Sequence, residues 1–80
     1  MNIEKMQIKG QLAEAKKKFK TLDTEASGLI ILIRSLLNPY EDIVKLEVDK
    51  AAHSMARLNS IVLEMQALKD KIQRMEQDFE

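Results

Sequence analysis

The chain has 80 residues, of which 45% are hydrophobic and 32% are charged, and its formal net charge is zero. This balance excludes a chain that is disordered for lack of apolar residues, and the absence of cysteine excludes disulfides and thiolate metal sites. With only two glycines, one proline and 4% aromatic residues, the composition indicates an all-α protein built from long helices.

The first half of the chain carries an unbroken heptad pattern. Gly28 lies off this pattern and lowers helix propensity by about 1 kcal/mol, yet the pattern stays in phase across it. We therefore predict one helix over residues 3–37, with a single apolar seam of the coiled-coil type. The seam residues, spaced alternately four and three apart, are Ile8, Leu12, Ala15, Phe19, Leu22, Ala26, Leu29, Ile33 and Leu36.

The sequence Asn38-Pro39-Tyr40-Glu41 interrupts the pattern. A residue before proline is disfavoured in the α region, so Asn38 ends the first helix and suits the N-cap of a second. Pro39 then takes the first helical position, and Glu41 can accept a hydrogen bond from the Asn38 N–H. We predict an elbow at residues 38–40 and a second helix over residues 39–78.

The second half repeats the spacing of four and three with one irregularity. Leu58 and Ile61 add an extra spacing of three, a stammer that would locally overwind a coiled coil. The predicted seam residues are Val44, Val48, Ala51, Met55, Leu58, Ile61, Met65, Leu68, Ile72, Met75 and Phe79.

A short joint between two long helices favours an antiparallel hairpin, here a single domain over residues 1–80. In this arrangement Phe19 is expected near Leu58, and Ile33 near Val44. Two alternatives stay open: a kinked continuous helix through Pro39, and a three-helix unit broken near Gly28.

Near the elbow the apolar surface is wider than one seam, because Ile30, Leu37 and Ile43 lie outside it. A helix that is apolar on more than one face needs more than one neighbour. We therefore expect two hairpins to form a four-helix bundle, with a dimer favoured over a tetramer and the pairing direction left open. The residues expected to carry this association are Leu29, Ile30, Ile33, Leu36, Leu37, Ile43, Val44 and Leu46.

These features predict a non-enzymatic interaction or scaffold protein that binds itself, with a further protein partner left open. The alternative is a small nucleic-acid-binding bundle. It would use the basic run of the first helix together with one arginine of the second to contact phosphates. Its candidate contacts are Lys16, Lys17, Lys18, Lys20 and Arg57.

Residue types that carry catalysis or bind cofactors do not form a recognisable pattern. His53 is the only histidine, and with Asp49 four residues before it the sequence offers two ligands where a metal site needs three or four. We predict no catalytic, cofactor-binding or metal-binding residues and no enzymatic activity. The longest aliphatic run is too short to span a membrane, so we expect a cytoplasmic protein without a membrane partner.

Three segments resemble small helical proteins encoded by Mu-like prophages of bacteria. They are the lysine-rich first helix, the elbow LIILIRSLLNPYEDIV and the stretch MARLNSIVLEMQALKDKI. The resemblance implies a bacterial or phage setting in the cytoplasm. It implies no mechanism and assigns no functional residues.

Overall fold

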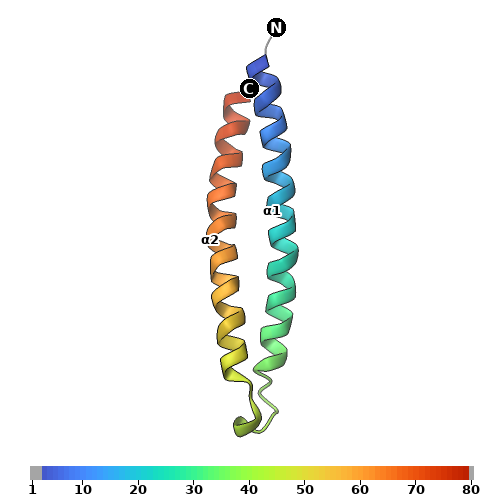
Figure 1. Ribbon diagram of the computed structural model, residues 1–80, viewed down its shortest axis with the longest axis vertical. Coiled ribbons are helices and arrows are strands. Elements are labelled where there is room, and N and C mark those ends of the chain that lie inside the picture. Colours follow the sequence, from blue (N-terminus) through green and yellow to red (C-terminus); the bar gives the residue numbers. More distant parts are fainter. Residues whose placement is uncertain (1–2, 80) are drawn as a thin grey trace.

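The computed structural model is a helical hairpin (Figure 1). Helix α1 spans Ile3–Leu36 and helix α2 spans Val48–Phe79, and a single turn of 3₁₀ helix, η1, spans Ile43–Lys45 in the connection. The structure describes the backbone of residues 3–79 and the side chains of residues 6–78. The Cα atoms extend over 65 × 15 × 14 Å, so the hairpin is a slender rod.

Helix α1 confirms the predicted heptad seam. All nine seam positions from Ile8 to Leu36 are buried or half-buried, and the other described side chains of α1 are exposed. The helix runs through Gly28 without a break, so the alternative of a three-helix unit broken there is wrong. Burial follows the heptad because only that face of α1 meets α2.

The core is narrow and is tightest near the middle of the hairpin. Leu22, Ala26 and Ile61 are buried together, and Ile61 is completely removed from solvent. Half-buried side chains surround this cluster from both helices: Leu29, Leu58, Met65 and Leu68. Two helices in contact along one seam therefore bury few residues completely.

The elbow is longer than predicted, and α2 begins at Val48 instead of residue 39. Asn38 does accept a local hydrogen bond through its side chain, but from the Tyr40 N–H two residues ahead, at 3.0 Å. The Glu41 N–H then donates to the Asn38 carbonyl at 3.1 Å, which closes a four-residue turn with Pro39 in its second position. The capping chemistry expected of a helix start thus makes a turn that reverses the chain.

A second local signal explains why the chain stays out of α-helix after this turn. The Asp42 side chain caps η1 by accepting from the Val44 N–H, and Leu46 is extended with ψ of 133°. The Glu41 carboxylate accepts a hydrogen bond from the Asp42 N–H and not, as predicted, from that of Asn38. The predicted elbow at residues 38–40 is therefore replaced by a connection over residues 37–47.

The longer connection changes the seam of α2. Val44 lies in the elbow and Val48 is exposed, so neither belongs to the seam. Ser54 is half-buried and takes the seam position that the sequence assigned to Met55, which is exposed. With Ser54 in place the spacing of three and four is regular, and the predicted stammer between Leu58 and Ile61 is absent from α2. The predicted seam residue Phe79 lies outside the residues whose side chains are described.

The register of the two helices is shifted from the prediction for the same reason. Ion pairs join Lys18 to Glu64 and Glu25 to Arg57, so this part of α1 lies beside residues 57–64. Phe19 shares a shallow groove with Ile72 and is not placed beside Leu58, and Ile33 does not face Val44. An elbow with more residues moves the helical partner of each α1 residue further along the sequence.

Candidate functional site

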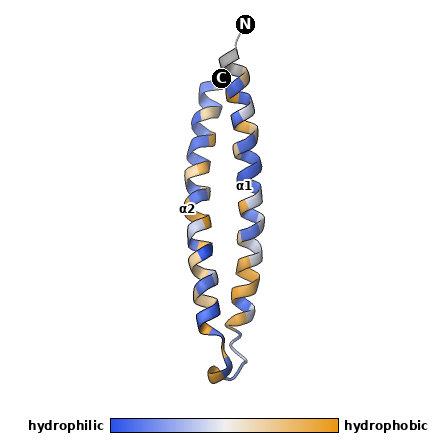
Figure 2. Cartoon of the chain, viewed as in Figure 1, coloured by the Kyte–Doolittle hydropathy of each residue, from blue (hydrophilic) through white to orange (hydrophobic). Residues whose placement is uncertain are grey.

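Most of the large apolar side chains that are exposed lie in the elbow half of the hairpin. Figure 2 shows hydrophobic residues concentrated in the last turns of α1 and in the elbow. Tyr40 is 95% exposed, Ile43 is 80% exposed and Val44 is 87% exposed. Leu37 is exposed as well and Leu46 is half-buried, so only one of the five large apolar side chains in the connection over residues 37–47 is even partly covered.

The predicted interface residues divide into two groups. Ile33 is buried, and Leu29 and Leu36 are half-buried, because all three belong to the seam against α2. Ile30 and Leu37 are exposed beside that seam, as are Ile43 and Val44 in the elbow. Only this second group, with part of Leu46, is available to a partner while the hairpin stays closed.

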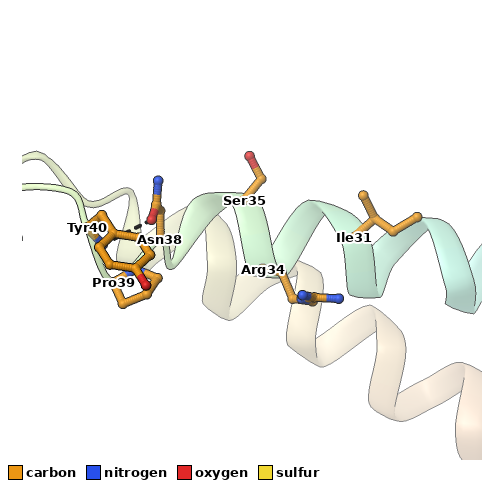
Figure 3. Close-up of a pocket in the computed structure, with 6 residues that line it drawn as sticks. All are labelled: Ile31, Arg34, Ser35, Asn38, Pro39 and Tyr40. Atoms are coloured by element: carbon orange, nitrogen blue, oxygen red, sulfur yellow. Dashed lines mark hydrogen bonds between the residues drawn. The ribbon is translucent and has the colours of Figure 1, made fainter.

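The outer side of α1 near the elbow is also apolar in part. Ile31 and Ser35 project from α1 away from α2, above a shallow groove that ends at Pro39 and Tyr40 (Figure 3). The groove is lined further by Arg34 and Asn38, and the one hydrogen bond drawn among its residues is the turn contact of Asn38 with Tyr40. Its polar groups are thus a surface arginine, a turn amide and the hydroxyls of Ser35 and Tyr40, and none of these lining residues is a base that could activate Ser35.

The two long edges of the hairpin, where α1 and α2 meet the solvent, differ in chemistry. One edge, here called the ion-paired flank, carries Lys18, Glu25, Arg57 and Glu64. The Arg57 guanidinium forms two parallel hydrogen bonds with the Glu25 carboxylate, Nε to Oε2 at 2.7 Å and Nη2 to Oε1 at 2.9 Å. Lys18 Nζ lies 2.9 Å from Glu64 Oε1. This flank joins the helices through exposed charges.

The contact between Glu25 and Arg57 shifts the pKa of both side chains. Hydrogen bonding from Arg57, assisted by its charge, holds the pKa of the Glu25 carboxyl below its usual value of 4.5, while desolvation opposes the shift. Hydrogen bonding to Glu25 in turn raises the pKa of Arg57. Both side chains are exposed to solvent, so this is a surface contact whose strength depends on salt.

The opposite edge is here called the apolar flank. It carries charged residues toward the termini and apolar residues toward the elbow. Lys16 follows the seam residue Ala15, whereas Lys18 precedes the seam residue Phe19, so the two lysines lie on opposite sides of the seam. Lys16 Nζ pairs with Glu76 Oε1 at 3.0 Å. Moving along both helices toward the elbow by one heptad at a time gives successive rows on the same flank: Asp23 with Lys69, Ile30 with Val62, and Leu37 with Met55.

Sequence reasoning missed Met55 and Val62, which complete the apolar flank from α2. It assigned Met55 to the seam and did not include Val62 among the residues expected to carry association. The signal that could have found them is the exact heptad spacing of Val48, Met55 and Val62, parallel to the seam. All three are exposed in the hairpin.

The candidate nucleic-acid contacts are largely paired with carboxylates. Lys16, Lys18 and Arg57 make inter-helix ion pairs with Glu76, Glu64 and Glu25. Arg57 lies opposite Glu25, two helical turns or about 10 Å from Lys18 along α1, so it does not extend the basic run. Lys17 and Lys20 are exposed. These carboxylates reduce the net positive charge of the surface around the basic run. The nucleic-acid alternative stays a prediction from the sequence.

A metal site and a membrane-spanning helix were not expected from the sequence, and the structure can be examined for both within its described residues. Within residues 6–78 no group of three or more metal-ligating side chains lies close enough to hold a metal ion, and His53 is exposed. Neither α1 nor α2 is long and apolar enough to cross a membrane. The predictions of a non-enzymatic and cytoplasmic protein stay predictions.

Comparison with known proteins gives no family assignment. No protein-family model matches the sequence, and neither a curated protein nor a solved structure matches the chain. The resemblance to Mu-like prophage proteins therefore stays a prediction, and the candidate site is defined by its own geometry.

Proposed function

We propose that this chain is a self-associating helical hairpin, an interaction or scaffold module whose partner is a second copy of itself. The observation that carries the proposal is the exposure of Ile30, Leu37, Ile43 and Val44 around one end of a hairpin that has no interior to receive them. Large contiguous apolar patches on a protein surface mark contact sites. Two hairpins that cover these patches would form a four-helix bundle.

The energetics support association for a chain of this size. Complete burial of one such aliphatic side chain contributes about 1.5–3 kcal/mol. A single core in a protein of about 80 residues rarely supplies more than about 3–5 kcal/mol, and only six apolar residues are buried among the side chains of residues 6–78. Covering a few of the elbow side chains would thus add a stabilisation comparable to that of the whole intramolecular core.

The mass of the protein in solution tests the proposal directly. Sedimentation equilibrium at micromolar concentration should give a multiple of the 9.2 kDa chain mass, with a dimer as the expected species. The double variant Ile30→Lys/Leu37→Lys should sediment as a monomer, because lysine at these positions would have to be desolvated in the interface.

A matched control separates charge at the elbow from charge in general. Ala13→Lys/Ala67→Lys adds the same charges at exposed helical positions far from the elbow, and it should keep the mass of the unaltered chain. A well-folded monomer of the unaltered chain at micromolar concentration would refute self-association.

A further inference from the structure

Resting on the proposed self-association, the geometry points to one specific dimer: two hairpins stacked through their apolar flanks, side by side and elbow to elbow, about a two-fold axis along the hairpin. The surface that meets its copy runs along the hairpin, and its centre is formed by the three heptad rows Asp23–Lys69, Ile30–Val62 and Leu37–Met55. The ion-paired flank would face solvent.

The apolar flank is the flank that remains incompletely covered. Its four aliphatic and thioether side chains, Ile30, Leu37, Met55 and Val62, are all exposed in the hairpin. Ile30 lies in α1, Leu37 directly follows it and still donates its N–H to the Ile33 carbonyl, and the other two lie in α2, so they form a strip across the hairpin and not a ridge on one helix. On the other flank two of the three corresponding rows are occupied by the ion pairs Lys18–Glu64 and Glu25–Arg57, and the third, nearest the elbow, holds Leu32 with Lys50.

Two-fold symmetry along the hairpin makes this flank complementary to itself. Such an axis stacks α1 of one copy on α2 of the other at the same height, so Ile30 meets Val62 of the second copy and Leu37 meets its Met55. In the next row Asp23 meets Lys69 of the second copy, and Lys69 meets its Asp23. Neither Asp23 nor Lys69 takes part in an ion pair within the described part of the hairpin, so both charges are available for these contacts.

The antiparallel stacking of two hairpins is less complementary. If the strip is centred on itself with the copies reversed, each elbow lies beside the Asp23–Lys69 row of the other copy. The exposed Ile43 and Val44 would then face charged side chains. Parallel stacking instead brings the two elbows to the same end of the bundle.

The size of the flank fits a stable dimer. A face of the hairpin extends over about 65 by 15 Å between Cα atoms. Standard specific interfaces bury about 800 Å² on each partner, so stacking along most of the length supplies the required area. Parallel stacking uses the whole length, whereas reversed stacking centred on the strip leaves the two ends near the termini unmatched.

The neighbouring residues Ile30 and Leu32 provide a matched test of the flank. Their exposures are nearly equal, 46% and 42%, but they lie on opposite sides of the seam. Ile30→Lys should raise the dissociation constant of the dimer at least about tenfold in sedimentation equilibrium, as expected for a central interface residue. Leu32→Lys should leave it within about twofold. Equal weakening by both variants, or weakening by Leu32→Lys alone, would overturn the assignment of the flank.

A charge exchange tests the direction of stacking. Asp23→Lys makes the charged row positive on both helices, and Lys69→Glu makes it negative on both. In the parallel dimer each variant alone should dimerise more weakly, and a mixture of the two, one of them isotope-labelled, should form heterodimers in clear excess over the statistical proportion in native mass spectrometry. A purely statistical mixture of homodimers and heterodimers would overturn the parallel arrangement.

A distance measurement gives an independent check. Because the chain has no cysteine, Lys17→Cys provides a single site for a spin label on the exposed outer side of α1. The two labels should lie about 20–30 Å apart in the parallel dimer, which is the width of a bundle of helices each about 10 Å across. In the reversed dimer the helical rise places them about 50 Å apart.

These outcomes are distinguishable from failure of the proposed function. A monomeric unaltered chain refutes self-association itself. A dimer with the long spin-label distance, or with equal sensitivity to Ile30→Lys and Leu32→Lys, retains self-association and overturns only this arrangement.

Discussion

Gly28 lowers the stability of α1, and neither close packing nor backbone conformation requires a glycine at this position. A Cβ atom built on Gly28 meets no atom within 4 Å, and its backbone is helical without a positive φ. Glycine in a helix interior is about 0.8–1.0 kcal/mol less favourable than alanine, because it loses more backbone freedom on folding.

We therefore expect Gly28→Ala to raise the free energy of unfolding by about 1 kcal/mol in urea denaturation. Alanine fits the helix at this position without a clash and restricts the unfolded chain. Gly28→Pro is the contrasting control, since proline inside a helix removes a hydrogen bond and should destabilise the hairpin strongly. A destabilising effect of Gly28→Ala would show that the space beside residue 28 is occupied in solution by another chain.

The Glu25–Arg57 contact predicts a local dependence on pH. Because the pKa of Glu25 is lowered in the folded chain, the contact stabilises the fold above the ordinary glutamate pKa of 4.5. This contribution is lost as the pH falls through the lower pKa of the folded state. An NMR titration of the Glu25 carboxyl carbon should give a midpoint below that of the variant Arg57→Met. Added salt should bring the two midpoints together, and identical midpoints at low salt would show that the pair does not form.

Among the helical elements, the middle of the seam carries most of the intramolecular packing. Ile61 of α2 is completely buried against Leu22 and Ala26 of α1, whereas Ile31 of α1 projects into solvent. The same chemical change at the two isoleucines should therefore have different effects.

We expect Ile61→Val to lower the free energy of unfolding by about 0.5–1.5 kcal/mol, because it removes a buried methylene group. Ile31→Val should change it by no more than about 0.5 kcal/mol, as for most exposed positions. Urea denaturation of the two variants at equal protein concentration compares them directly. Equal effects would mean that Ile31 is buried in the associated protein, or that the seam is not centred on Ile61.

The elements also show how much of the fold could be predicted. The seam of α1 follows from its sequence at every position, since a long helix with one apolar stripe has only one way to cover that stripe. The seam of α2 does not, because Ser54 and Met55 are adjacent and hydrophobicity alone favours Met55. The rotation of α2 about its own axis is set by its packing against α1. That rotation turns the smaller, polar Ser54 toward α1.

Across the whole molecule, stability should depend on protein concentration if hairpins associate. Association stabilises the folded state by mass action, so a tenfold increase in concentration should raise Tm by about 4 °C for a protein of this size. Thermal unfolding followed by circular dichroism at several concentrations measures the shift. The variant Ile30→Lys/Leu37→Lys should unfold at a Tm that does not change with concentration, and a concentration-independent Tm of the unaltered chain would contradict association.

The candidate surface was predicted only in part, because helical periodicity shows which residues share a face but not which face the second helix covers. Sequence reasoning included Ile30, Leu37, Ile43 and Val44 among the residues expected to carry association, and all four are exposed, although it also assigned Val44 to the second seam, which was wrong. It also included Leu29, Ile33 and Leu36, which the hairpin itself covers. Separating the two groups requires knowing which face of α1 meets α2. Met55 and Val62 can be assigned to the surface only when the rotation of α2 about its own axis is known.

By itself, the sequence determined that this protein consists of two long helices, that the first has a heptad seam, and that its apolar residues near the elbow exceed one seam. These properties depend on helical periodicity and on residue type, which are local. Only the tertiary structure decided where α2 begins, that Ser54 lies in the seam, and which charges pair across the helices. Those features depend on the length of the elbow between residues 36 and 48, because the elbow sets the register in which two otherwise independent helices meet.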